Sequence, residues 1–407
     1  MERPPLSLYV HLPWCESKCP YCDFNSHVWA SVPQHDYVRA LLADLDVEIA
    51  HAGEAQAVGS VFLGGGTPSL FSPGAIVALL DGVRARLALA PACEVTLEAN
   101  PGTVLAAHLA GYRAAGVTRV SLGVQSFDDG ALARIGRVHD ARTARAALDA
   151  VADAGFASFN VDIMYGLPGQ NVAQALADVE QALASGADHV SHYELTIEPN
   201  TRFWSAPPVL PDDEAKWRMH ELAAARLAAA GLARYEVSAW ARAGARCRHN
   251  VNYWRFGDYL GIGAGAHGKL SRPATGRIER SRKHRRPERY LAGAGRAELV
   301  TRREDVAPEL VALEFMLNAA RLVEGFETSL FTARTGLAPA AIAPALERAA
   351  ARGLIERDPG RVVPTALGMR FLDDLVALFA AAPERSASPG EGAKRAAGHR
   401  EAFSPVL

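Results

Sequence analysis

The sequence predicts an α/β protein with a partial (β/α) barrel and a small C-terminal winged-helix-like α+β domain. Short runs rich in Val, Ile, Leu and Phe alternate with Ala-rich stretches in which apolar residues recur at helical spacing. This alternation is typical of βαβ units around a mainly parallel sheet. Polar and Gly-rich segments follow successive predicted strands, at the edge where parallel α/β folds build their sites. Six or seven repeats suffice for a full or partial barrel, and an open doubly wound sheet is the alternative.

Several segments in the first part of the chain have the length and composition of buried strands. They are Leu6–His11, Ser60–Gly64, Glu94–Glu98, Arg119–Val124, Phe159–Met164, His189–Leu195 and Arg234–Ala239. Helices are predicted between them, for example over Gly130–Ala154 and Asn171–Ser185. We expect these elements to form one large domain over residues 1–240.

The rest of the chain is expected to form a Gly- and Arg-rich connector over 241–300, a small domain over 301–382 and a disordered tail over 383–407. The predicted elements of the small domain are helices over Pro308–Ala320, Thr328–Thr335 and Pro339–Arg352, strands over Leu354–Arg357 and Arg361–Pro364, and a last helix. This order is that of a winged helix-turn-helix. Acidic residues outnumber basic ones in this domain, which argues against DNA binding.

The bulk properties exclude several classes of protein. A formal net charge of −2 over 407 residues gives no general attraction to nucleic acid or to anionic membranes. Five cysteines, three of them clustered, do not form the framework of a disulfide-rich secreted domain. There is no signal-peptide pattern and no apolar run of the ~18–20 residues that span a bilayer. We therefore expect a cytoplasmic protein with no nucleic-acid partner and no transmembrane segment, with at most peripheral membrane contact.

The most informative feature is the loop after the first predicted strand, which carries Cys15, Cys19 and Cys22. Three thiolates at the spacing C-x3-C-x2-C can hold three irons of a [4Fe–4S] cluster and leave the fourth iron open to an outside ligand. One alternative is a structural zinc site with His11 or His27 as fourth ligand, although a second C-x2-C pair is missing. The other alternative is three buried thiols.

Further polar and Gly-rich positions lie at or just beyond strand ends. The loop Gly64–Ser69 could bring backbone groups close to the amine and carboxylate of an amino-acid-type ligand such as S-adenosylmethionine, or could simply be a tight turn. The carboxylates of Glu98 and Asp162 suit ribose hydroxyls or an α-ammonium group, and Arg137 suits a carboxylate. Capping and loop hydrogen bonding are the alternative for these residues and for Gln125.

Two histidines are candidate haem ligands. His249 lies in the run His249-Asn250-x-x-Tyr253-Trp254, and His267 lies among glycines. Imidazole is a common axial ligand of haem iron, and Tyr and Trp form flat apolar walls. For each of them, a structural histidine is the alternative.

The basic run Arg277–Arg289 could receive porphyrin propionates or be a solvated loop. The remaining thiols, Cys93 and Cys247, are interpreted as ordinary thiols without a ligand role.

Taken together, these motifs resemble the oxygen-independent coproporphyrinogen III oxidase family of radical-SAM proteins. The resemblance covers roughly residues 5–380 and includes the segments Tyr9–Phe24, Gly64–Ser69, Glu98–Gly102, Leu122–Ser126 and Val161–Gln170. It implies a partial TIM-like barrel of the radical-SAM type. The chain is most similar to the haem chaperone branch, because Phe24 stands where the oxidases have a fourth cysteine. The segments Cys247–Trp254, Gly265–Gly268 and Glu314–Asn318 also resemble that branch.

The resemblance implies a role for each matching residue. Cys15, Cys19 and Cys22 would hold the cluster, and Tyr9, Gly65 and Glu98 would contact cluster-bound S-adenosylmethionine. The positions that match a second S-adenosylmethionine site of the oxidase are Tyr21, Gly66, Thr67, Gln125, Arg137, Asp162 and Thr196. Haem would be the cargo, passed to haem proteins of the respiratory chain, and the cluster would support dimer formation. The alternative is a true oxidase that removes hydrogen from a porphyrinogen propionate by a radical and then decarboxylates it. No catalytic residue is assigned.

Overall fold

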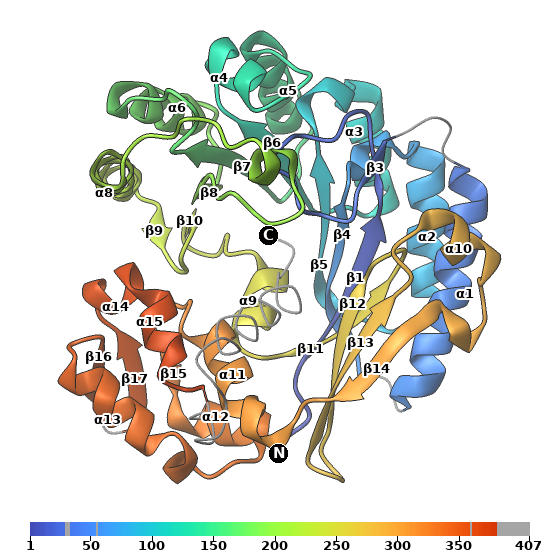
Figure 1. Cartoon of the computed structure of the whole chain (residues 1–407). Helices are drawn as coiled ribbons and strands as arrows, with labels where there is room; N and C mark the ends of the chain where they lie inside the picture. The colour runs from blue at the N-terminus through green and yellow to red at the C-terminus, as the bar shows by residue number, and fades with distance from the viewer. Residues whose placement is uncertain (29–32, 54–55, 359, 381–407) are drawn as a thin grey trace.

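The computed structural model describes residues 1–28, 33–53, 56–358 and 360–380. Its main element is a twelve-stranded sheet in the order β14-β13-β12-β11-β1-β4-β5-β6-β7-β8-β10-β9 (Figure 1). The central strands run parallel to one another. They are β11 (Asp258–Ile262), β1 (Leu6–Leu12), β4 (Val58–Gly65), β5 (Leu89–Ala99), β6 (Arg119–Gln125), β7 (Ser158–Tyr165) and β8 (His189–Glu194).

The barrel is partial, as predicted. On one side of the parallel strands the sheet ends in β10 (Ala239–Ala241) and β9 (Ala233–Arg234), and on the other in β12 (His267–Arg272), β13 (Arg277–Lys283) and β14 (Val300–Asp305). These edge strands all pair antiparallel. Within the described residues the two edge strands, β14 and β9, are not paired with each other, so the sheet curves without closing into a full barrel.

The strand predicted over Arg234–Ala239 is wrong in its middle. The guanidinium of Arg234 donates to the carbonyl of Val237 at 2.6 Å, and the backbone N–H of Ser238 donates to the Glu236 carboxylate at 3.1 Å. These bonds turn the chain, so that β9 and β10 form an antiparallel edge. The seventh parallel position, beside β1, is filled instead by β11.

The segment 241–300, expected to be a connector, belongs largely to the large sheet. It contains α9 (Arg248–Trp254), β11, β12, β13 and α10 (Pro287–Ala292), and the last strand β14 extends to residue 305. A buried ion-pair cluster fastens this segment to α1 (Gln34–Ala52): Lys283 lies 2.5 Å from both Asp44 and Glu48. Because a buried amine must be paired to remain charged, the cluster fixes the position of β13 against α1.

Helices cover the convex side of the sheet (Figure 1). They are α1, α2 (Pro73–Arg84), α3 (Ala106–Ala115), α4 (Asp129–Arg134), α5 (Ala141–Asp153), α6 (Val172–Ala184) and α8 (Asp213–Ala229), while α7 (Arg202–Ser205) is a single turn after β8. The helix predicted over Gly130–Ala154 is broken between α4 and α5. Gly136 has φ +71° there, and the side chain of Asp140 caps α5 by accepting from the N–H of Thr143.

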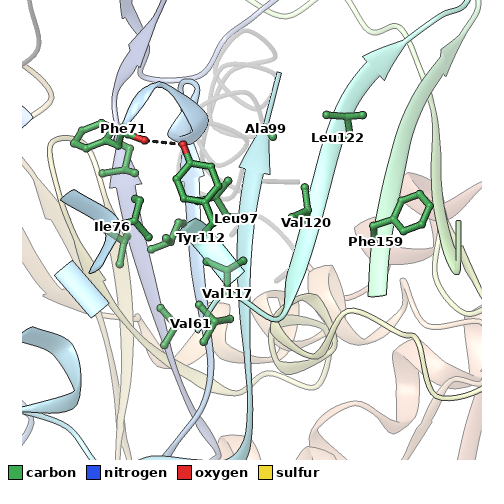
Figure 2. Packing of buried hydrophobic residues seen from close by; sticks show 14 of the residues in the cluster. Val61, Phe71, Ile76, Leu97, Ala99, Tyr112, Val117, Val120, Leu122 and Phe159 are labelled. Carbon is green, nitrogen blue, oxygen red and sulfur yellow. Dashed lines mark hydrogen bonds between the residues drawn. The ribbon is translucent and has the colours of Figure 1, made fainter. Parts of the chain in front are cut away.

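The core lies between the sheet and these helices. Figure 2 shows Val61, Leu97 and Val120 of the parallel strands against Ile76 of α2 and Tyr112 of α3. The hydroxyl of buried Tyr112 donates to the carbonyl of Phe71 at 2.6 Å. Burial of each such aliphatic side chain contributes about 1.5–3 kcal/mol, so this layer fixes the strand ends that carry the site.

The C-terminal domain has the predicted winged-helix order. It consists of α11 (Val311–Ala319), β15 (Phe326–Glu327), α12 (Thr328–Thr335), α13 (Ala343–Ala351), β16 (Ile355–Asp358), β17 (Arg361–Pro364), α14 (Ala366–Arg370) and α15 (Leu372–Ala377). Arg321 pairs with Glu236 at 3.2 Å, and Val323 N–H donates to the carbonyl of Tyr235, which joins the domain to the barrel.

The predicted disordered tail over 383–407 lies outside the described residues. In the part of the chain that the structure describes, no helix has the length and apolar character of a membrane span.

Candidate functional site

The cysteine loop follows β1 at the carboxyl edge of the sheet. The short strand β2 (Trp14–Cys15) pairs with β3 (His27–Val28) and closes the loop that carries the thiols. Cys22 N–H donates to the carbonyl of Cys19 at 3.1 Å, which forms a turn between those two residues. All three cysteines are free and half-buried.

The three thiols can be compared with what a single metal ion and a cluster each require. Among the described residues, no three His, Cys, Asp or Glu side chains converge on one ion position. The proposed fourth zinc ligands are engaged elsewhere: His11 Nε2 with the carbonyl of Asn25, and His27 Nε2 with the carbonyl of Arg285. A [4Fe–4S] cube binds each cysteine through a different iron, so its sulfurs need not surround one point. The described residues therefore form no four-ligand zinc site, and the three thiols are compatible with a cluster.

The surroundings act on the thiols in two ways: Arg137 brings a positive charge to Cys19, whereas burial disfavours the thiolate forms of Cys15 and Cys22. Arg137 Nη1 lies 3.6 Å from Cys19 Sγ, and its Nη2 donates to the carbonyl of Gly123 at 2.7 Å. Burial raises the pKa of Cys15, and it raises the pKa of Cys22 to about 11. These thiols therefore keep their protons until a metal displaces them. Arg137 lies in the break between α4 and α5, which brings its charge to the loop.

The Gly-rich loop after β4 packs against the chain itself. Gly65 has φ +115°, and a Cβ there would lie 2.5 Å from the ring of His11, while a Cβ on Gly66 would collide with the backbone of Trp14. Gly66 N–H donates to the carbonyl of Leu12, and Thr67 N–H donates to the carbonyl of Trp14. The glycines therefore allow β4 to approach the cysteine loop, and these two N–H groups are already used.

Two half-buried carboxyl groups lie on nearby strands, Glu98 near the end of β5 and Asp162 in the middle of β7. Glu98 accepts a 3.1 Å hydrogen bond from Gly65 N–H, and Asp162 accepts from Asn160 at 2.7 Å and from Ser121 at 3.1 Å. Burial, together with the charge of Asp162, raises the pKa of Glu98 to about 8. Burial also raises the pKa of Asp162. Two desolvated carboxyl groups near each other are a suitable site for a cationic or hydroxyl-bearing ligand.

Gln125, at the end of β6, and Tyr21, in the cysteine loop, lie at the carboxyl edge of the parallel strands. Gln125 has φ +72° beside a bulge between β6 and β7, and its side-chain carbonyl accepts a 2.5 Å hydrogen bond from Tyr193. A non-Gly residue at positive φ is costly, and such strain is typical of functional positions. Tyr21 packs on an apolar cluster that includes Leu167 and Phe203, and burial raises its pKa above the ordinary value.

A cavity of about 890 Å³ opens between the cysteine loop, the segment after β8, the strands β12 and β13, and the helices α11 and α15. Tyr9, His11, Thr196 and His267 line it, so three predicted site residues and the cysteine loop share one space with the C-terminal domain. The Tyr9 hydroxyl bonds His11 Nδ1 at 2.8 Å, and burial lowers the pKa of His11 to about 4.

His249 lies behind the cavity, in the barrel interior, and is 1% exposed. Its Nδ1 bonds the Ser60 hydroxyl at 3.0 Å and its Nε2 bonds the Tyr253 hydroxyl at 2.8 Å. Burial lowers its pKa to about 3, so the ring is neutral. Both nitrogens are therefore occupied, which is the environment of a structural histidine.

Sequence reasoning missed several residues of the site. Tyr193, which bonds Gln125, lies near the end of β8, and its place at a strand end was a usable signal. Asn25 carried no signal, although its side chain reaches the carbonyls of Ala264 and Arg285. Arg282 was predicted only as part of a basic run, and it lies directly opposite His267 in the β12–β13 pair.

Comparison with known proteins places these features in a family. The pattern of the Radical SAM superfamily matches residues 9–182, and that of the HemN C-terminal domain matches residues 306–371. The chain is 48% identical over 382 residues to a protein of Escherichia coli (strain K12) named "Heme chaperone HemW", covering 94% of this chain and 100% of the relative. It is 44% identical to a protein of the same name from Haemophilus influenzae, covering 93% and 98%.

The fold also has a solved counterpart. The structure of coproporphyrinogen III oxidase (HemN) from Escherichia coli, described as a radical SAM enzyme, superposes with a TM-score of 0.76 over 93% of this chain and 90% of that chain. The two sequences are 22% identical, so this likeness establishes the fold alone.

Proposed function

Because the chain belongs to the family of heme chaperone HemW proteins within the radical SAM superfamily, we propose that it binds haem and transfers it to acceptor haem proteins of the respiratory chain. The observation that carries this proposal is the 48% identity to a haem chaperone over that relative's full length. The cavity supports it, since a space of about 890 Å³ with aromatic walls and basic side chains suits a flat, dianionic cargo.

The proposed cofactors are a [4Fe–4S] cluster on Cys15, Cys19 and Cys22 and an exchangeable S-adenosylmethionine. When bound, the cluster supplies an open iron position for the amino-acid part of that ligand. Tyr9 and Glu98 are the proposed contacts beside Gly65, because Glu98 accepts from Gly65 N–H and the Tyr9 hydroxyl bonds His11, whose ring lies against Gly65. Glu98 would hold a proton at neutral pH until a cationic group approaches it.

The number of S-adenosylmethionine molecules is open to direct measurement. The residues proposed for a second molecule are Tyr21, Gly66, Thr67, Gln125, Arg137, Asp162 and Thr196. The backbone N–H groups of Gly66 and Thr67 already have partners within the chain. Equilibrium dialysis with labelled S-adenosylmethionine, on cluster-loaded protein, should give one bound molecule if this second set does not act as a site, and two if it does.

We also propose that the protein acts in the cytoplasm and that the loaded cluster promotes a homodimer. Light scattering after gel filtration, with and without the cluster, tests the dimer. The same mass in both states would contradict it.

The function is tested with anaerobically purified, cluster-loaded protein. Titration with haem should give a saturable Soret band, and incubation with an apo-form of a membrane haem protein should move that band to the acceptor. A parallel incubation with coproporphyrinogen and a reductant tests the oxidase alternative. Decarboxylated product at catalytic turnover would overturn the chaperone proposal. The same titration and transfer are measured on Cys15→Ala, which removes a proposed cluster ligand, and on its matched control Cys93→Ala, which removes a thiol outside the loop.

A further inference from the structure

The cavity contains one histidine whose ring is available to a ligand. His11 and His267 both line it. Both nitrogens of His11 are engaged, with the Tyr9 hydroxyl and with the carbonyl of Asn25. Among the described residues, no group forms a hydrogen bond with the ring of His267, although the residue is only partly exposed. Burial and the nearby charges of Arg282 and Arg280 lower its pKa to about 4, so it is a neutral imidazole with a free lone pair at neutral pH.

The strands around His267 present a row of cations to the same cavity. In the antiparallel pair β12–β13, His267 lies opposite Arg282 and Lys269 lies opposite Arg280. Alternate residues of a strand share a face, so these four side chains point the same way. Opposite residues of such a pair have Cβ atoms about 4.5–5.5 Å apart, which places Arg282 beside the imidazole.

Three other cations that line the cavity are already paired with carboxylates within the chain. Arg280 pairs with Glu314 at 2.9 Å, Lys269 with Asp258 at 2.8 Å and Arg321 with Glu236 at 3.2 Å. In the described part of the chain, Arg282 has no carboxylate within ion-pair distance. Lys18 and Arg285 also line the cavity, but they bond atoms of the cysteine loop, the carbonyl of Phe24 and the side chain of Asn25. Of the described cavity cations without a carboxylate partner, Arg282 is therefore the one that stands opposite His267 and is best placed to receive a carboxylate from outside. Arginine binds carboxylates in a bidentate manner, which adds orientation as well as affinity.

We propose that His267 is the axial ligand of haem iron in this cavity and that Arg282 binds one haem propionate, whereas His249 does not ligate the iron. This assignment rests on the proposed function for the identity of the cargo. The neutral imidazole donates its lone pair to the iron, and neither the iron nor the protein changes oxidation state. The rings of Tyr253, Phe256 and Tyr259 form the apolar walls of the cavity near the strand pair.

The test is a titration of the full-length protein with ferric haem, followed by optical and EPR spectroscopy. In His267→Ala the imidazole-ligated spectrum should be lost and the dissociation constant should rise at least tenfold. Added free imidazole should restore the spectrum, which a purely structural defect would not allow. His267→Cys should give a thiolate-ligated spectrum instead. Arg282→Ala should raise the dissociation constant roughly fivefold and leave the ligation spectrum unchanged.

Two variants serve as controls. His249→Gln should keep the wild-type spectrum, and His35→Ala, at an exposed position of α1, should match the wild type throughout. The assignment is overturned if His267→Ala keeps the wild-type spectrum and affinity, or if His249→Gln abolishes ligation. If the wild-type protein binds no haem, both this assignment and the proposed function fail. If it binds and transfers haem with His267 replaced, only this assignment fails.

Discussion

The side-chain amide of Asn25 donates a 2.8 Å hydrogen bond to the backbone carbonyl of Ala264. A second bond of 2.9 Å runs to the carbonyl of Arg285, and the carbonyl of Asn25 itself accepts from His11 Nε2 at 2.8 Å. Gly265 has φ +86°, and a Cβ there would collide with the Asn25 side chain. The end of the cysteine loop is therefore joined directly to the turn that leads into β12 and His267.

Replacing Asn25 with Ala should loosen this junction. Two hydrogen bonds to backbone carbonyls are lost, at a cost of about 1–2 kcal/mol in the free energy of unfolding. The loaded cluster should also be lost faster in air, measured by the decay of its visible absorbance. Gln56→Ala, which removes one side-chain bond to the carbonyl of Pro4, is the control. Equal rates of cluster loss in both variants would argue against a role for Asn25 in holding the loop.

Arg137→Gln should shift the reduction potential of the loaded cluster. The guanidinium lies 3.6 Å from Cys19 Sγ, and a cation beside a thiolate ligand favours the more negative, reduced cluster. Its removal should therefore lower the midpoint potential, measured by an EPR-monitored redox titration. Arg134→Gln removes the same charge from α4, where the side chain bonds the carbonyl of Pro168, and should leave the potential nearly unchanged.

Gly65→Ala should destabilise the protein, and Gly74→Ala should not. Gly65 has φ +115°, and a Cβ added there would lie 2.5 Å from the His11 ring, so we expect a loss of about 1–3 kcal/mol. At Gly74, in the first turn of α2, a Cβ meets no atom within 4 Å, and Ala favours the helix. Urea unfolding of both variants measures the difference. Equal stabilities would show that the loop adapts to a side chain.

Glu98→Gln should change the pH dependence of stability. The pKa of Glu98 is about 8 in the folded protein, so the fold retains a proton that the unfolded chain releases near pH 4.5. Stability from this group is present at low pH and lost as the pH rises towards 8. The variant lacks this loss, so its stability relative to the wild type should increase with pH, by at most about 1.4 kcal/mol per pH unit.

Urea unfolding of the apo-protein at pH 5.5, 7 and 8.5 measures this trend. Glu180→Gln is the control with no pH trend: the hydrogen bond from Arg226 lowers the pKa of that exposed carboxyl, so it is ionised in both the folded and the unfolded chain throughout this pH range. Parallel stability profiles for wild type and Glu98→Gln would mean that Glu98 is ionised in the fold.

The sequence predicted the parallel strands well because Val, Leu, Ile and Phe recur throughout them, even where polar residues interrupt the run. β1, β6 and β7 begin and end within one residue of the predicted ranges. It did not predict β13, whose sequence Arg-Ile-Glu-Arg-Ser-Arg-Lys is nearly all polar. Several charges of that strand are paired with distant partners, such as Glu314 for Arg280 and Asp44 for Lys283. The sequence around β13 contains no local pattern that indicates ion pairs with residues so far away along the chain.

The candidate site was predictable where chemistry depends on residue type and spacing. The cysteine spacing and the carboxyl groups at strand ends could be found in this way. The sequence could not show which of the two candidate haem histidines is available to a ligand, because that depends on contacts made only in the folded structure. Ser60 and Tyr253 occupy both nitrogens of His249, and these partners come from β4 and α9. His267 differs in facing the cavity.

The pairing of β11 with β1 has a consequence for biosynthesis. β1 precedes the cysteine loop, yet one of its two neighbours comes from residues 258–262. A ribosome must therefore translate well over half of the chain before the outer edge of β1 is covered. A nascent N-terminal fragment would expose that edge and leave the thiols on an incomplete support, since pairing between distant segments forms late. Iron and sulfide should thus be inserted after the chain has left the ribosome.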